Sequence, residues 1–145
     1  NTTKSIPVGL YWTSSAPVEK GAYVLWCPPK VGVFDDAKER GYIGAGFCPG
    51  DYGYMMKRVL AAKDDAVSVA DDGVRVNGEL LAHSKPIQAD KSGRPLPRFQ
   101  ASTYTLGSAE LLLMSDVSDT SFDGRYFGPI NRSQVQTVIR PVITW

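Results

Sequence analysis

Short apolar stretches separated by turn sequences constrain the fold of this 145-residue chain more than any other feature. Apolar and polar residues alternate within several of them, which is the period of a half-buried β-strand. Asp71-Asp72-Gly73 and Asn77-Gly78 are turns of the kind that joins antiparallel neighbours. The stretches that we expect to form strands are residues 22–26, 55–60, 66–69, 74–76, 79–81, 110–114 and 135–143. The sequence therefore predicts a mainly β, antiparallel fold.

Little helix is expected beside these strands. Residues 34–40 suit one short helix, because Asp35 or Asp36 would lie near its positive end and Gly41 follows as a stop. Residues 84–98 combine three prolines and a glycine with basic side chains, which predicts an exposed, irregular excursion. We therefore expect an antiparallel β domain with one or two short helices.

The size and charge of the chain exclude several classes of protein. A chain of 145 residues, 43% of them hydrophobic and 21% charged, is expected to form one soluble globular domain over residues 1–145. The net charge of +1 and the lack of a basic run predict no nucleic-acid partner. The sequence also contains no signal-peptide core and no apolar run long enough to span a membrane.

Two cysteines, Cys27 and Cys48, each lie directly before a proline. They could be two unrelated buried thiols, or a disulfide that indicates an oxidising compartment. The cysteine count favours neither alternative. A structural zinc site needs four ligands, and the single histidine, His83, is distant in the sequence, so no metal is expected.

Ser5 is the first candidate for chemistry. Pro7 restricts Ile6 to an extended backbone, and Gly9 permits a turn, so Ser5 can be held at a fixed angle. In an extended segment Thr3 points to the same side as Ser5. The Thr3 hydroxyl and the Ser5 backbone N–H could then stabilise an oxyanion together.

Lys57 is the second candidate. On a strand it shares one face with Met55 and Val59, so it lies between apolar neighbours. A lysine that loses its hydration has a lowered pKa, and a lysine must be neutral to take a proton from a serine. The alternative is a lysine that extends to the surface at a strand edge.

A third polar stretch follows the apolar residues 110–114. Within it, a buried hydroxyl of Ser121 could orient the lysine, and an Asp123–Arg125 pair could rigidify the surrounding backbone. The alternative is a surface turn with an isolated ion pair. A Ser-His-Asp triad is less well supported, because the sequence around His83 is more typical of a surface histidine. The sequence contains no metal-binding, phosphate-binding or dinucleotide-binding motif.

These stretches, in this order, resemble the sequence boxes of bacterial type I signal peptidases. Lys57-Arg58-Val59 resembles the lysine box of the family, and Val76-Asn77-Gly78 resembles the Val-Asn-Gly sequence that follows that box. Residues 121–128 resemble the closing box. The pattern of Asn1, Thr3, Ser5, Pro7, Gly9 and Tyr11 is similar to one branch, the conjugative-transfer peptidases of broad-host-range plasmids. Arg40-Gly41-Tyr42 and Cys48-Pro49-Gly50 also fit that branch. The resemblance covers nearly the whole chain and implies a signal-peptidase-like fold.

The resemblance also implies roles for single residues. Ser5 would be the nucleophile and Lys57 the general base, with Thr3 as the second oxyanion donor beside the Ser5 N–H. Ser121 falls where the family keeps a hydroxyl on the lysine, and Asp123 and Arg125 fall on its structural acidic and basic positions. The chain departs from the family at Ser115, where a glycine is usual, at Gly124, where a serine is usual, and at Lys63-Asp64-Asp65, where Pro-Gly-Asp is usual.

The function implied by this resemblance is that of a Ser/Lys serine peptidase without a cofactor, which processes the pilin precursor of a conjugation apparatus by hydrolysis or by cyclisation. The domain would lie in the periplasm. Because a catalytic serine so near a free end would be poorly anchored, we expect an upstream segment that attaches it to the inner membrane. Two alternatives stay open: a general signal peptidase that releases many exported proteins, and an inactive β domain that serves as an assembly or adaptor module.

Overall fold

The computed structural model describes residues 4–29, 32–97, 99 and 101–145. Two antiparallel sheets account for most of its regular structure. The larger sheet has six strands, in the order β1 (Gly9–Ser14), β11 (Val135–Thr144), β2 (Tyr23–Trp26), β4 (Met55–Ala61), β9 (Glu110–Met114) and β10 (Ile130–Asn131). The smaller sheet has four, in the order β7 (Glu79–Leu80), β6 (Gly73–Val76), β5 (Ala66–Ala70) and β8 (Ala101–Thr105). The mainly β prediction is confirmed.

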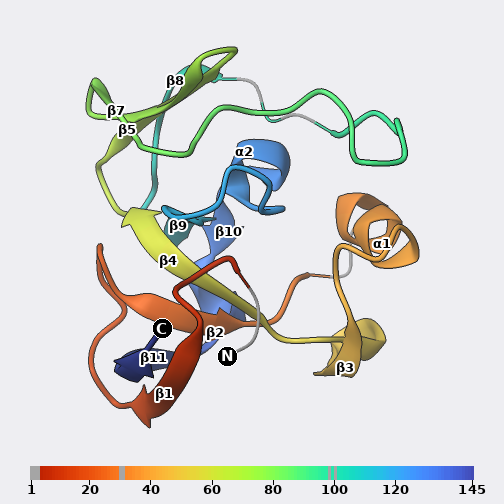
Figure 1. Ribbon diagram of the computed structural model, residues 1–145. Helices are drawn as coiled ribbons and strands as arrows, with labels where there is room; N and C mark the ends of the chain where they lie inside the picture. Colours follow the sequence, from red (N-terminus) through yellow and green to blue (C-terminus); the bar gives the residue numbers. More distant parts are fainter. Residues whose placement is uncertain (1–3, 30–31, 98, 100) are drawn as a thin grey trace.

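Helices are short in the described part of the chain. They are α1 (Gly32–Glu39), α2 (Gly124–Phe127) and the 3-10 turns η1 (Pro49–Asp51) and η2 (Arg132–Gln134), and the short strand β3 (Ala45–Cys48) lies between α1 and η1. Among the described residues, no helix is long and apolar enough to cross a membrane. The small sheet lies at one end of the molecule and the β1–β11 pair at the other, with β4 running between them (Figure 1).

Strand β9 explains how two cores form in so short a chain. Leu111 and Leu113 face a core built with Trp26 and Phe34, whereas Leu112 and Met114 face a second core under the small sheet. These four side chains are fully buried. A strand with both faces covered reads as a continuous apolar run, which is why residues 110–114 do not alternate.

The strands that the sequence did not predict are mostly exposed. The described side chains of β8, residues 102–105, are exposed, and in β1 only Gly9 is buried. Without a buried face, such strands carry no apolar alternation. Gly9 does not form the expected turn, since it begins β1 and pairs with Thr144. A Cβ atom at Gly9 would lie 2.1 Å from the carbonyl oxygen of Ile143, so close packing of the two strands excludes a side chain here.

Candidate active site

Three polar side chains from distant parts of the sequence meet at one point. Lys57 Nζ donates a hydrogen bond of 2.8 Å to Ser5 Oγ and one of 2.9 Å to Ser121 Oγ. The two hydroxyl oxygens lie 2.8 Å apart. Lys57 comes from β4, Ser5 precedes β1, and Ser121 lies in the segment between β9 and α2. The structure therefore brings together the three residues that sequence reasoning selected.

The position of Lys57 follows from the alternation of β4. Met55, Lys57, Val59 and Ala61 are buried, and the residues between them are only partly buried. The lysine is 3% exposed and pairs across the strands with Val24 of β2. A long charged side chain at this position is therefore enclosed by the sheet and extends toward Ser5.

Burial lowers the pKa of Lys57 to about 8, from an ordinary value of 10.5. Loss of hydration is the largest cause; the negative charge of Asp123 raises the pKa, and the positive charge of Arg125 lowers it. At pH 7 a lysine with this pKa is neutral in about one molecule in ten, against roughly one in 3,000 for an ordinary lysine. The neutral amine that a serine needs as a base is thus populated near physiological pH.

Asp123 and Arg125 form a fully buried ion pair behind Ser121. Arg125 Nε and Nη2 each donate a 2.8 Å hydrogen bond to one oxygen of the Asp123 carboxylate, and neither side chain is exposed. Asp123 also accepts hydrogen bonds from the backbone N–H groups of Arg125, at the start of α2, and of Ser115. The pair therefore ties the end of β9 to the start of α2.

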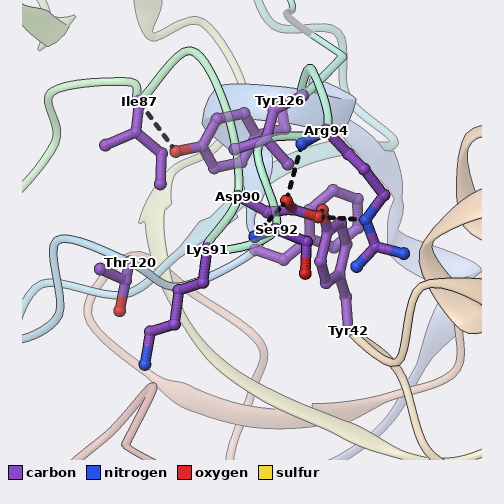
Figure 2. Close-up of a pocket in the computed structure, with 10 residues that line it drawn as sticks. Tyr42, Ile87, Asp90, Lys91, Ser92, Arg94, Thr120 and Tyr126 are labelled. Atoms are coloured by element: carbon purple, nitrogen blue, oxygen red, sulfur yellow. Dashed lines mark hydrogen bonds and ion pairs between the residues drawn. The ribbon is translucent and has the colours of Figure 1, made fainter.

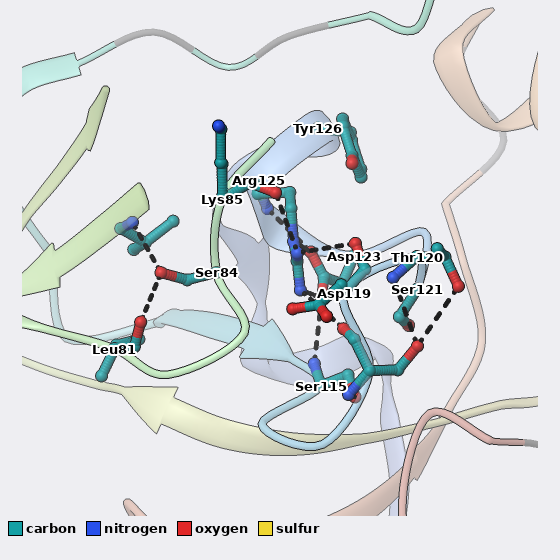
Figure 3. A network of polar contacts seen from close by, with 12 residues as sticks. Leu81, Ser84, Lys85, Ser115, Asp119, Thr120, Ser121, Asp123, Arg125 and Tyr126 are labelled. Carbon is teal, nitrogen blue, oxygen red and sulfur yellow. Dashed lines mark hydrogen bonds and ion pairs between the residues drawn. The ribbon is translucent and has the colours of Figure 1, made fainter. Parts of the chain in front are cut away.

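The guanidinium of Arg125 also holds the segment that carries Ser121. It donates to the carbonyl oxygens of Ser118 and Asp119 at 3.3 Å and to that of Lys85 at 3.4 Å. Figure 3 shows these contacts converging on the Asp123–Arg125 pair. The pair therefore fixes the backbone on both sides of Ser121, and its supporting role in the site stays a prediction.

Ser115 is a supporting residue that sequence reasoning treated only as a departure from the family pattern. It is fully buried, its N–H binds Asp123, and its hydroxyl accepts hydrogen bonds from the backbone N–H groups of Val117 and Ser118. A serine hydroxyl that bonds nearby backbone groups is a common turn device. The serine at this position thus shapes the segment between β9 and Ser121.

The structure places Ser5 and His83, two residues considered from the sequence, in different surroundings. Ser5 is half-buried, whereas Thr3, the expected second oxyanion donor, lies outside the described residues. His83 Nδ1 lies within hydrogen-bonding distance of Asp119 Oδ1, at 3.0 Å on the exposed surface, and does not contact Ser5 or Lys57. Among the described residues, no group of three or more His, Cys, Asp or Glu side chains could hold a metal ion.

Cys27 and Cys48 form a disulfide, so the second of the two alternatives for these cysteines is confirmed. The bond joins the residue after β2 to the last residue of β3, and both cysteines are buried. It closes a loop across a separation of 21 residues that contains α1. The disulfide therefore ties the end of the segment that contains α1 to the residue after β2, a strand of the large sheet.

A serine hydroxyl hydrogen-bonded to a buried lysine of lowered pKa, with a second hydroxyl on the lysine, is the arrangement of a Ser/Lys dyad. Comparison with known proteins agrees with this class. The family model "Signal peptidase, peptidase S26" matches residues 2–145. The chain belongs to the S26 signal peptidase family.

Within this family the chain is TraF-like. It is 86% identical to a plasmid transfer protein TraF of Escherichia coli over 145 residues, which are 100% of this chain and 82% of that protein. It is 79% identical to a second Escherichia coli plasmid transfer protein TraF, with the same shares covered. A conjugal transfer protein TraF of Agrobacterium fabrum is 35% identical, over 100% of this chain and 81% of that protein.

Among solved structures, a signal peptidase I of Enterococcus faecalis aligns with 86% of this chain and 98% of its own. The sequence identity is 18% and the TM-score 0.47, so no residue of the site is carried over from that structure.

Proposed function

We propose that this chain is a serine endopeptidase with a Ser5/Lys57 dyad that processes the pilin precursor of a conjugation apparatus. The observation that carries the proposal is the 2.8 Å hydrogen bond between Ser5 Oγ and a 3%-exposed lysine. The pilin as substrate is supported by the family resemblance and by relatives that are named plasmid and conjugal transfer proteins.

The reaction begins when neutral Lys57 takes the proton of the Ser5 hydroxyl while Ser5 Oγ attacks the carbonyl carbon of the scissile peptide bond. This gives a tetrahedral intermediate with a negative oxygen, which the Ser5 N–H and Thr3 stabilise in this proposal. The protonated Lys57 then gives its proton to the leaving nitrogen as the C–N bond breaks. The product is an ester of Ser5 and a free amine. Ser121 keeps the lysine amine directed at Ser5 throughout.

The acyl-enzyme is released by a second nucleophile. Water gives a free carboxylate, whereas the amino terminus of the same pilin gives a new peptide bond and a cyclic product. In both routes Lys57 takes a proton from the nucleophile and returns one to Ser5 Oγ. The same dyad therefore serves hydrolysis and cyclisation, and mass spectrometry of the released pilin distinguishes them, because a cyclic product weighs one water less.

We also propose that the domain works in the periplasm, attached to the inner membrane by a segment upstream of Ser5. The Cys27–Cys48 disulfide supports an oxidising compartment. Labelling of the two cysteines in intact cells tests this: a fully reduced pair in freshly trapped protein would contradict a periplasmic location.

The decisive experiment for the dyad is the pH dependence of Ser5 acylation by a small activated ester, followed by intact mass. We expect the wild-type rate to rise with pH through about 8, because the neutral fraction of Lys57 rises there. Lys57→Ala should fold but react at least 100-fold more slowly. Equal rates in the two proteins would contradict the peptidase and favour an assembly or adaptor module.

The breadth of substrates tests the pilin assignment separately. A general signal peptidase should cleave unrelated exported precursors, whereas a pilin-processing enzyme should cleave the precursor encoded with its own transfer system and leave the others intact. Cleavage of all precursors at similar rates would replace the pilin assignment while leaving the dyad in place.

A further inference from the structure

A cavity of about 270 Å³ lies next to the segment that carries Ser121, with Thr120 in its wall (Figure 2). Thr120 and Phe122 line it, and these are the two chain neighbours of Ser121. Because consecutive Cα atoms are about 3.8 Å apart, the wall of the cavity begins one residue from the hydroxyl that holds Lys57.

Aromatic rings form much of the wall. Tyr42 and Phe122 lie 5.4 Å apart between ring centroids, and Phe122 stacks on Tyr126 at 5.9 Å. Ile87 and Leu96, from the 84–98 excursion, close the cavity from the other side. The surface that a ligand would meet is thus largely apolar.

Three polar side chains of the wall, those of Tyr42, Asp90 and Arg94, are joined by hydrogen bonds to Asp90. Asp90 accepts hydrogen bonds from the Tyr42 hydroxyl, from Arg94 Nε at 2.7 Å, and from the backbone N–H groups of Ser92 and Arg94. The hydrogen bond from Tyr42 is the largest cause that lowers the pKa of Asp90 to about 2. The Tyr126 hydroxyl accepts from the N–H of Ile87. A carboxylate so fully engaged is a structural group of the wall rather than an acceptor for a ligand.

The wall is also fixed in place, although its residues come from an irregular segment. Arg40 Nη1 donates a 2.6 Å hydrogen bond to the carbonyl oxygen of Pro95, and Arg94 Nη2 donates to that of Arg40. The excursion is therefore fastened to the end of α1, and Arg125 holds its other end at Lys85. The size of the cavity falls just below the roughly 300–1,000 Å³ of small-molecule pockets, so it suits one large side chain.

We infer that this cavity binds an apolar or aromatic side chain of the peptide substrate, a few residues from the scissile bond, and so selects the substrate of the Ser5/Lys57 centre. The inference rests on the proposed peptidase function and adds to it the chemistry that the enzyme recognises. It assigns a role to the 84–98 excursion, which the dyad itself does not use.

The test is a substitution that fills the cavity. Ser92 is exposed at its edge and binds Asp90 only through its backbone N–H, so Ser92→Trp places an indole in the cavity and keeps that bond. Ser108→Trp, at an exposed position between β8 and β9, is the matched control. Both variants and wild type are measured with a small activated ester, which is too short to reach the cavity, and with a randomised peptide mixture read by mass spectrometry.

We expect wild type and Ser108→Trp to select large apolar residues at one position near the cleaved bond. Ser92→Trp should lose about 10- to 100-fold in kcat/KM for those peptides while its ester acylation is unchanged. Unchanged selection and rate in Ser92→Trp would overturn the inference while the peptidase function stands. Failure of wild type to react with the ester or with any peptide would remove the peptidase function and this inference with it.

A second pair of variants distinguishes a change in the cavity from a general loss of folded protein. Ile87→Ala enlarges the cavity, and Leu80→Ala, on the exposed strand β7, removes the same number of carbon atoms elsewhere. Ile87→Ala should shift the selected residue toward larger rings, whereas Leu80→Ala should select as wild type does. The same selection in both variants would contradict a side-chain site at this cavity.

Discussion

The Asp123 carboxylate is bound on both of its oxygens by the Arg125 guanidinium, at 2.8 Å each, and neither side chain reaches solvent. This pairing matters for Lys57, because Asp123 raises the pKa of the lysine and Arg125 lowers it. The two charges oppose each other, so burial decides the result and the lysine can be neutral near pH 8. The ion pair thus affects the pKa of Lys57 and also stabilises the backbone around Ser121.

Arg125→Gln should therefore change both stability and pH dependence. An uncompensated buried carboxylate costs about 3–5 kcal/mol of the free energy of unfolding, measured by urea denaturation. In the fraction that stays folded, the charge of Asp123 should raise the pKa of Lys57, so the midpoint of the acylation–pH profile should move to higher pH. Arg75→Gln, at an exposed ion pair, should change neither quantity noticeably. An unchanged midpoint in Arg125→Gln would contradict the electrostatic role.

Ser121→Ala should slow acylation by about 10- to 100-fold without unfolding the protein, because the Lys57 amine loses the hydroxyl that holds it toward Ser5. Ser121→Thr keeps a hydroxyl and should recover most of the rate. The rates are measured with the small activated ester at several pH values. If the alanine and threonine variants react equally slowly, packing around Ser121 rather than its hydroxyl sets the rate.

Gly124 marks a departure from the family pattern that the structure explains. A Cβ atom at this position would lie 2.6 Å from Leu112 Cδ1 and 3.0 Å from the carbonyl oxygen of Leu113. Gly124→Ser should therefore destabilise the protein by about 1–3 kcal/mol, since α2 must move away from β9. Gly44→Ser is the control, because nothing lies within 4 Å of a Cβ atom there. Equal unfolding midpoints for the two variants would show that α2 accommodates a side chain.

The strands and the burial of Lys57 could be predicted because their residues follow a period. The alternation in residues 55–60 places Lys57 on the same face as Met55 and Val59, and the structure buries all three. The apolar run of β9 likewise indicates a buried strand. Local patterns of this kind need no knowledge of distant segments.

The burial of Arg125 could not be predicted in the same way. A polar stretch after a strand is usually a surface turn, and only contacts with the carbonyl oxygens of distant residues such as Lys85 allow a guanidinium to be fully enclosed. The cavity beside Ser121 was also beyond sequence reasoning. Its walls depend on the hydrogen bond that fastens Pro95 to Arg40, between segments far apart in the chain.

The Cys27–Cys48 disulfide should stabilise the fold without acting in catalysis. Closing a loop of this length contributes about 3 kcal/mol to the free energy of unfolding in the chain-entropy model. The double variant Cys27→Ala, Cys48→Ala should lose about that amount in urea denaturation and keep its acylation rate while folded. A reduced wild-type protein should behave like the double variant. Loss of acylation in the folded, reduced protein would instead connect the disulfide to the geometry of the dyad.

Lys57→Met should stabilise the protein at neutral pH while abolishing acylation. The pKa of Lys57 is about 8 in the folded chain and 10.5 when exposed, so the unfolded chain binds an extra proton between these values. The stability of wild type is therefore reduced below pH 8 by up to about 3 kcal/mol, and recovers as the pH rises toward 10.5.

Methionine fills a similar space without a charge to desolvate, so the advantage of Lys57→Met should be largest below pH 8 and shrink above it. Urea denaturation of both proteins from pH 6 to 10.5 measures this difference, and the other titrating groups cancel between them. A difference that does not vary with pH would mean that burial does not lower the pKa of Lys57. A difference that shrinks with rising pH would show that the folded chain lowers the pKa of Lys57 at the expense of stability.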